Sequence, residues 1–171
     1  AYSFGCENVL ELGGEHIIVL YVEDVNGNVS AANITVTVKD TISPTVITQN
    51  ITAELNASAS ATITAAMIND GSFDNCDIDT IYLDDYTFDC SDVGTNTVIL
   101  TVEDIHGNVT TGTATVTVED NVNPVAATQN ITVQLNSSGA ATITASQIDN
   151  NSSDACGIDT IYLDEYDFDC S

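Results

Sequence analysis

The sequence has almost no positive charge. Its 171 residues contain one lysine or arginine against 26 aspartate and glutamate residues, which gives a formal net charge of −25. Binding to phosphate groups requires lysine and arginine, so this composition excludes nucleic acid and anionic membrane surfaces as partners. The charge keeps the chain soluble, but its self-repulsion opposes compact packing unless cations relieve it.

Tryptophan is absent, and the chain has only two histidines. The lack of tryptophan removes a residue that commonly lines sugar subsites. Apolar residues are interleaved with Thr, Asn and Asp, so no run predicts a transmembrane helix, a signal peptide or direct membrane insertion. His16 and His106 do not occupy corresponding positions of the repeat described below, so neither belongs to a site that the repeat preserves. We therefore expect no enzymatic activity.

What the sequence does contain is a long internal repeat. CDIDTIYLDDYTFDC at Cys76–Cys90 returns as CGIDTIYLDEYDFDC at Cys156–Cys170, a shift of 80 residues. In that frame Asp40–Ser91 and Asp120–Ser171 share 31 identities over 52 positions. Self-similarity at a fixed period indicates a tandem array. A unit of this length is too long for a helical solenoid repeat and suits a small independent domain.

The period divides the chain into the C-terminal part of one repeat (1–39), a complete repeat (40–119) and the N-terminal part of the next (120–171). We interpret the chain as a window onto a longer array. The linkers between repeats are short, and each holds one proline, Pro44 or Pro124, which restricts the backbone.

Within the complete repeat, apolar and polar residues alternate. Val98, Leu100 and Val102 share one face, and Ala114, Val116 and Val118 share another, with threonines between them. Such alternation is typical of half-buried antiparallel strands. Short strands at this spacing predict an all-β fold of tandem immunoglobulin-like Greek-key β-sandwich repeats.

The five cysteines follow the repeat. The simplest scheme pairs them within each repeat, as Cys76–Cys90 and Cys156–Cys170, and gives Cys6 a partner upstream of residue 1. A bridge that closes a loop of about 15 residues would stabilise a repeat by roughly 3 kcal/mol. Regular pairing of this kind indicates an oxidising, extracytoplasmic location. The alternative is pairs of buried free thiols in a cytosolic protein. No CxxC spacing is present, which argues against a zinc site.

The motifs FDCSDVGTNTVILTVED (Phe88–Asp104), GNV and TATVTVED make the chain resemble a known family. They are similar to the HYR-like immunoglobulin-fold repeats of giant Bacteroidetes surface adhesins, such as gliding-motility adhesins of the SprB type. The resemblance covers nearly the whole chain. It implies a secreted glycoprotein, displayed at the bacterial cell surface and acting in cell adhesion.

Acidic side chains gather around the predicted linkers. Calcium prefers six to eight oxygen ligands, which carboxylates, Asn and backbone carbonyls supply. We therefore predict a Ca²⁺ site at the junction of consecutive repeats, resembling the joints of cadherins. The alternative is a solvated acidic surface. The candidate ligands are Asp40, Asp74, Asp104, Glu119, Asp120, Asn121 and Asp154.

Two shorter patterns carry further predictions. Asp24–Asn28 (DVNGN) resembles a fragment of a calcium loop, but Asn-Gly between alternating segments also predicts a hairpin turn, and we favour the turn. Thr41, Thr80 and Thr160 each follow Asp and precede Ile, a pattern similar to the O-glycosylation signal of Bacteroidetes. They are the candidate modification sites.

The sequence as a whole predicts spacer or stalk repeats of an extracellular adhesin or surface filament. The partners are then the neighbouring repeats of the same chain, with lateral self-association into a fibre as a further option. The alternative is a glycan- or protein-binding immunoglobulin-like module. The main departure from the repeat is Glu7–Gly14, which is four residues longer than its counterpart and would be the place for such a binding site.

Overall fold

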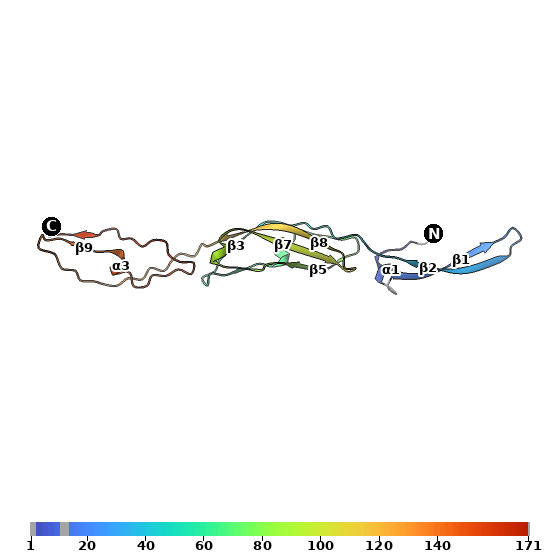
Figure 1. Ribbon diagram of the computed structural model, residues 1–171, viewed down its shortest axis with the longest axis horizontal. Helices are drawn as coiled ribbons and strands as arrows, with labels where there is room; N and C mark the ends of the chain where they lie inside the picture. The colour runs from blue at the N-terminus through green and yellow to red at the C-terminus, as the bar shows by residue number, and fades with distance from the viewer. Residues whose placement is uncertain (1–2, 11–13, 171) are drawn as a thin grey trace. The chain divides into compact units, whose positions relative to one another are not determined.

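A computed structural model describes residues 3–10 and 14–170 of the chain. Most of the regular structure is β-strand and the helices are short, so the fold is all-β (Figure 1). The elements are α1 (Cys6–Leu10), β1 (Glu15–Glu23), β2 (Val29–Thr37), β3 (Ile51–Glu54), β4 (Ala61–Thr62), α2 (Ala65–Ile68), β5 (Ile78–Leu83), β6 (Thr87–Phe88), a 3-10 turn (Cys90–Asp92), β7 (Gly94–Asp104), β8 (Val109–Glu119), β9 (Ala141–Thr142), α3 (Ala145–Ile148) and β10 (Asp167–Phe168).

The chain forms two compact units, each assembled from separate stretches of sequence. Unit 1 comprises Ala1–Gln49, Thr64–Asp85 and Val98–Ala114. Unit 2 comprises Asn50–Ile63, Tyr86–Thr97 and Thr115–Ser171. Each unit therefore contains one of the two linkers between sequence repeats, together with the loops on either side of that linker.

The main sheet has the strand order β3-β8-β7-β5. In unit 1, β5 pairs antiparallel with the end of β7, so that Ile78 faces Asp104 and Leu83 faces Leu100. In unit 2, β3 pairs parallel with the end of β8, with Ile51 opposite Val116. A second, two-stranded antiparallel sheet joins β4 and β6. A parallel pair cannot be made by a tight turn, so the β3–β8 pairing requires a long connection through the intervening strands.

The period-two pattern of β7 and β8 does define the buried face, as predicted. Leu100 and Val102 are fully buried, and Val116 and Val118 are buried in unit 2. The core of unit 1 consists of Ile68, Cys76, Leu83, Val98, Leu100, Val102, Asp104 and Ala114, and that of unit 2 of Ala53, Leu55, Ala61, Ile63, Phe88, Val116, Val118 and Ile143.

Local structure recurs at the spacing of the sequence repeat. The isolated bridge between Thr45 and Phe73 has its counterpart in the bridge between Val125 and Ser153. Helix α2, a single turn, is matched by α3, and each begins after a threonine in extended conformation. The segment before β3 thus pairs with the polar loop that follows α2.

Residues 3–10, 14–39 and 120–170 form fewer strand pairs than the complete repeat does. β1 and β2 form a hairpin, drawn in blue in Figure 1. Its turn is the one predicted for Asp24–Asn28, with Gly27 at φ +87°. Residues 131–134, the counterpart of β3, form no strand. Their partner in the complete repeat is the end of β8, and residues 120–171 include no counterpart of β8.

The insertion at Glu7–Gly14 contains most of α1, while residues 11–13 lie outside the described part.

None of the described helices has the length and apolar character needed to cross a bilayer.

Candidate functional site at the repeat junction

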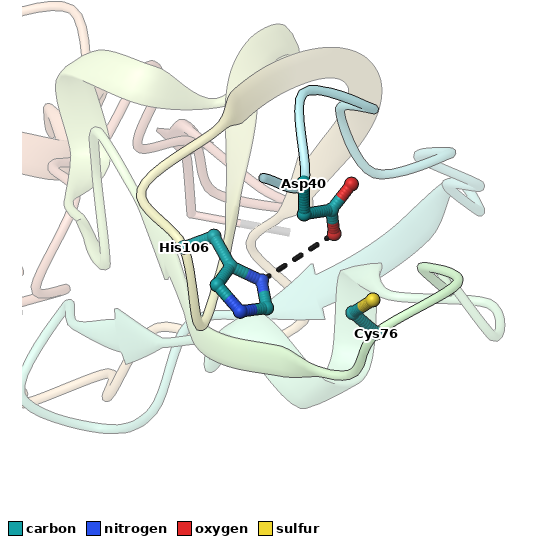
Figure 2. A group of neighbouring side chains, drawn as sticks. All are labelled: Asp40, Cys76 and His106. Carbon is teal, nitrogen blue, oxygen red and sulfur yellow. Dashed lines mark ion pairs between the residues drawn. The ribbon is translucent and has the colours of Figure 1, made fainter. Parts of the chain in front are cut away.

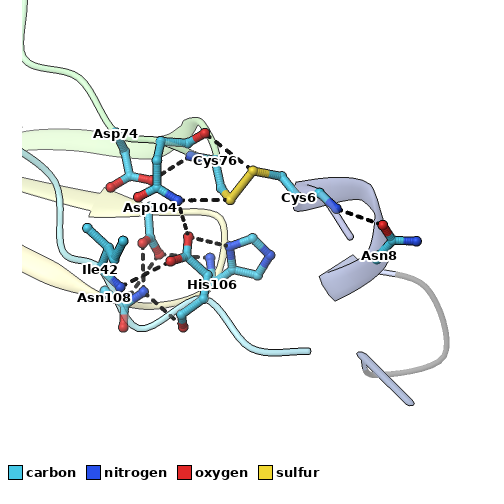
Figure 3. The surroundings of a disulfide bond; sticks show 11 residues. Cys6, Asn8, Ile42, Asp74, Cys76, Asp104, His106 and Asn108 are labelled. Atoms are coloured by element: carbon cyan, nitrogen blue, oxygen red, sulfur yellow. Dashed lines mark hydrogen bonds and ion pairs between the residues drawn. A yellow bond between two sulfur atoms is a disulfide. The ribbon is translucent and has the colours of Figure 1, made fainter. Parts of the chain in front are cut away.

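The two disulfides join consecutive sequence repeats rather than closing each repeat on itself. Cys6 pairs with Cys76 across a sequence separation of 70 residues, as Figure 3 shows. Cys90 pairs with Cys156 across 66 residues. The predicted pairs Cys76–Cys90 and Cys156–Cys170 are therefore wrong, as is the upstream partner for Cys6. Cys170 is the free, exposed cysteine.

The length of strand β7 explains why the predicted pairing fails. Cys76 directly precedes the region where β5 meets the end of β7, at the pair Ile78 and Asp104. Cys90 instead precedes the start of β7 at Gly94. A strand of 11 residues is about 35 Å long, whereas a disulfide needs Cα atoms within about 7 Å. The two cysteines of one repeat thus belong to opposite ends of the same strand.

Disulfides that recur in this way form and persist in oxidising compartments. The two bonds therefore place the chain outside a reducing cytoplasm.

The junction in unit 1 is built around the disulfide Cys6–Cys76. The backbone N–H of Cys76 donates to Asp74 Oδ2 at 2.8 Å, and the carbonyl of Asn75 lies 3.3 Å from Cys6 Sγ. In the linker, the carboxylate of Asp40 accepts from the backbone N–H of Ile42 at 3.0 Å. The Asn75 amide also donates to Asp40 Oδ2 at 3.3 Å, which ties the linker to the loop that carries the disulfide.

The junction in unit 2 repeats this arrangement. The backbone N–H of Cys156 donates to Asp154 Oδ1 at 2.8 Å, and the carbonyl of Ala155 lies 3.5 Å from Cys90 Sγ. In the linker, Asp120 Oδ1 accepts from the N–H of Val122 at 3.1 Å. Each of these contacts has its counterpart 80 residues earlier in the chain. The exception is Cys6, the counterpart of Cys90, which lies four residues further upstream because of the Glu7–Gly14 insertion. The same joint therefore occurs twice.

Three of the predicted calcium ligands come together at the first junction. Carboxylate oxygens of Asp40, Asp74 and Asp104 lie within 4.8 Å of one another. Asp40 comes from the linker, Asp74 from the loop before β5, and Asp104 from the end of β7. The side chain of Asp40 is only 3% exposed and Asp104 is 1% exposed, so water screens these charges poorly.

Asp104 also organises the β7–β8 turn. Its Oδ1 accepts from the backbone N–H groups of His106 and Asn108, at 2.8 and 2.9 Å, and its Oδ2 accepts from the Asn108 amide at 2.7 Å. Burial raises the pKa of Asp104, but the hydrogen bonds from Asn108 and His106, with the charge of His106, hold that pKa below its usual value. Asp104 is therefore ionised at neutral pH.

His106 lies beside Asp40, and Figure 2 shows the two side chains facing each other. Its Nδ1 lies 3.4 Å from Asp40 Oδ2, which makes an ion pair when the imidazole is protonated. The side chain is 8% exposed, and neither ring nitrogen has a hydrogen-bond partner. The neighbouring Cys76 sulfur cannot ligate a metal as a thiolate because it is committed to the disulfide.

The donor set fits a calcium ion better than a transition metal, because the three clustered carboxylates offer only oxygen. One oxygen, Asp74 Oδ1, is buried and has no hydrogen-bond partner. The equivalent oxygen at the second junction, Asp154 Oδ2, is also buried without a partner. An ionised oxygen deprived of both water and a donor is costly, and a cation would satisfy it.

The remaining predicted ligands do not form such a cluster. Asn121 donates to Glu119 Oε2 at 3.3 Å beside Asp120 in the second linker. Within residues 3–10 and 14–170, however, no three acidic, histidine or cysteine groups gather around Asp154. Residues 120–171 contain no counterpart of Asp104 or His106. Thr41, Thr80 and Thr160 are all exposed.

Two contributors were not predicted from the sequence. His106 does not correspond to the other histidine, His16, in the repeat frame, and Asn75 lies where the next repeat has alanine. The position of His106 in a D-x-H-G-N turn was a usable signal, since the turn places it beside the first aspartate. His16 lies elsewhere, with its Nε2 2.7 Å from the carbonyl of Asn8.

Comparison with known proteins adds no further assignment: no protein-family model, no curated protein and no solved structure matches this chain.

Proposed function

We propose that the chain is a set of structural spacer repeats from an extracellular adhesin or surface filament, in which a disulfide reinforces every joint. The observation that carries this proposal is the duplicated junction. Cys6–Cys76 and Cys90–Cys156 each tie one sequence repeat to the next. A binding module has no need of such a bond, whereas a spacer transmits force and orientation through its joints.

The strand arrangement supports immunoglobulin-like repeats as the building block. The order β3-β8-β7-β5, with the first strand parallel to the last, together with a separate β4–β6 pair, suits a two-sheet Greek-key sandwich. In a tandem array of such repeats each unit contacts only its neighbours, so the properties of the joint decide those of the array.

We further propose that the joint binds calcium. The ligands would be the carboxylates of Asp40, Asp74 and Asp104, with Asp74 Oδ1 offering the buried oxygen that no donor satisfies. A bound divalent ion would link the linker, the disulfide loop and the β7–β8 turn. The exposed acidic side chains elsewhere remain a solvated coat. The proposal assigns no catalytic activity to the chain.

Two measurements on the 171-residue chain test the spacer function. Small-angle scattering of the oxidised and reduced forms reports whether the disulfides restrict the joints: reduction is expected to broaden the distribution of interatomic distances. A binding screen of the immobilised chain against glycans and extracellular proteins is expected to find no specific ligand. Specific, saturable binding would overturn the spacer function in favour of a binding module.

A further inference from the structure

The disulfides provide a second covalent path through the chain. From the N-terminus, the backbone reaches Cys6, and the disulfide leads directly to Cys76. The backbone then runs through β5 and β6 to Cys90, where the second disulfide leads to Cys156. This path omits the backbone between Cys6 and Cys76 and between Cys90 and Cys156.

We propose that this disulfide path carries tension applied to the ends of the chain, so that most of each repeat is never loaded. In the complete repeat, only the segment Cys76–Cys90 lies on the path. Off the path lie the linkers, the β7–β8 hairpin, β3 and β4. The carboxylates of Asp40, Asp74 and Asp104 also lie off the path, although Asp74 contacts Cys76. This inference rests on the proposed spacer function and specifies how such a spacer would bear force.

The physical reason is the difference between covalent and non-covalent restraint. An immunoglobulin-like repeat held only by its sheets unravels when force breaks the hydrogen bonds between its terminal strands, and it then releases its whole length. Here β3 lies in the stretch that Cys6–Cys76 bypasses, and its parallel partner β8 lies in the stretch that Cys90–Cys156 bypasses. Tension cannot reach that pair until a disulfide breaks.

The segment on the path is itself short and paired. β5 is held to β7 along the register from Ile78–Asp104 to Leu83–Leu100. Even if this pairing failed, a fully extended Cys76–Cys90 segment would be about 50 Å long, at about 3.4 Å per residue. The same rise gives about 270 Å for a repeat of 80 residues. The array is thus nearly inextensible while oxidised.

The difference is large enough for a direct measurement. With the two disulfides intact, the chain pulled from its ends reaches about 130 Å, because only the backbone before Cys6, from Cys76 to Cys90 and after Cys156 is extended. With both disulfides reduced it reaches about 580 Å. Pairing within each repeat would instead give about 490 Å for the oxidised chain.

The experiment is single-molecule force spectroscopy of the 171-residue chain, held by peptide-tag handles at both ends and pulled without and with the reductant TCEP. We expect about 130 Å of contour without TCEP and about 580 Å with it. The variant Cys6→Ser/Cys76→Ser should reach about 360 Å without TCEP, since only the second bridge remains. Cys170→Ser, which removes the free thiol, should behave as the unmodified chain.

Either of two results would overturn the inference: a non-reducing contour near the reduced value, or one near 490 Å. The outcome is separate from the test of the spacer function. A chain that binds a specific ligand yet shows the short contour would lose the spacer function and keep the load path. A chain that binds nothing yet extends fully without TCEP would lose the load path and the disulfide reinforcement of the joints, while the absence of a ligand would still agree with a spacer.

Discussion

Calcium is expected to raise the melting temperature of the oxidised chain through the carboxylates of Asp40, Asp74 and Asp104. These oxygens lie within 4.8 Å of one another. At that separation and an effective dielectric constant of ~20, each pair of negative charges repels by roughly 3.5 kcal/mol. His106 offsets part of this repulsion only when protonated. A divalent ion would offset it whatever the charge of the imidazole.

The size of the effect follows from mass action. Calcium sites of extracellular modules have dissociation constants of about 10⁻⁴ to 10⁻³ M. At about 10 mM Ca²⁺ such a site stabilises the folded state by roughly 1.4 to 2.7 kcal/mol. For a domain the size of one 80-residue repeat, a stabilisation of 1 kcal/mol raises the melting temperature by about 4 to 8 °C. We therefore expect calcium to raise the melting temperature by about 6 to 20 °C.

The assay is differential scanning calorimetry of the non-reduced chain in EGTA, in CaCl2, and in NaCl at the same ionic strength. Asp74→Asn removes the buried oxygen that lacks a partner and should abolish the rise. Asp79→Asn removes an exposed carboxylate from β5 and should preserve it. Equal melting temperatures in calcium and sodium, or a rise that survives Asp74→Asn, would refute the calcium site.

Three further predictions concern stability in urea and at low pH. Cys6→Ser/Cys76→Ser opens a loop with a sequence separation of 70 residues and should lower the free energy of unfolding by about 4.4 kcal/mol. Gly112→Ala places a Cβ 2.7 Å from a Val46 methyl and should cost about 1 to 3 kcal/mol. Asp104 has a lowered pKa, so its contribution is complete above its unfolded value of 3.8 and is lost as pH falls below it. Asp104→Asn should flatten the acid limb of the stability curve.

Each of these has a matched control. Cys170→Ser removes a cysteine without opening a loop, and a non-reducing peptic map should link the Cys6 and Cys76 peptides in the unmodified chain. Thr111→Ala changes the exposed neighbour of Gly112 and should be nearly neutral. Asp24→Asn alters the equivalent turn carboxylate of the exposed β1–β2 hairpin. If it changed the acid limb as much as Asp104→Asn, the buried hydrogen bonds of Asp104 would contribute no more to stability than the exposed ones of Asp24.

Much of the local structure was readable from the sequence. Alternation predicted the buried faces of β7 and β8, because a strand places successive side chains on opposite sides of the sheet. The Asn-Gly and His-Gly turns were predictable, since glycine accepts the positive φ that such turns require. The gathering of Asp40 with Asp74 was also predicted, because the linker and the loop before β5 were expected at the same end of the repeat.

The disulfide pairing was not predictable from the sequence, because the number of residues between Cys76 and Cys90 does not say whether the chain between them turns back or runs on. A short separation in sequence suggested a small loop, whereas the intervening residues are mostly extended and carry the two cysteines to opposite ends of β7. The clue was present in Cys6, whose position relative to Cys76 copies that of Cys90 relative to Cys156. Only the tertiary structure brought those pairs together.

The burial of apolar side chains also depends on tertiary structure as well as on the local sequence pattern. Leu20 and Val22 occupy the positions of Leu100 and Val102 in the repeat, and their own strand is just as regular. Yet Leu20 is 60% exposed and Val22 59%, while Leu100 and Val102 are fully buried. Sequence determined that these residues form a hairpin with one apolar face, because alternation and turn chemistry are local properties. The tertiary structure decided whether that face is covered, because β7 and β8 lie between β5 and β3 in a four-stranded sheet, whereas β1 and β2 pair only with each other among the described residues.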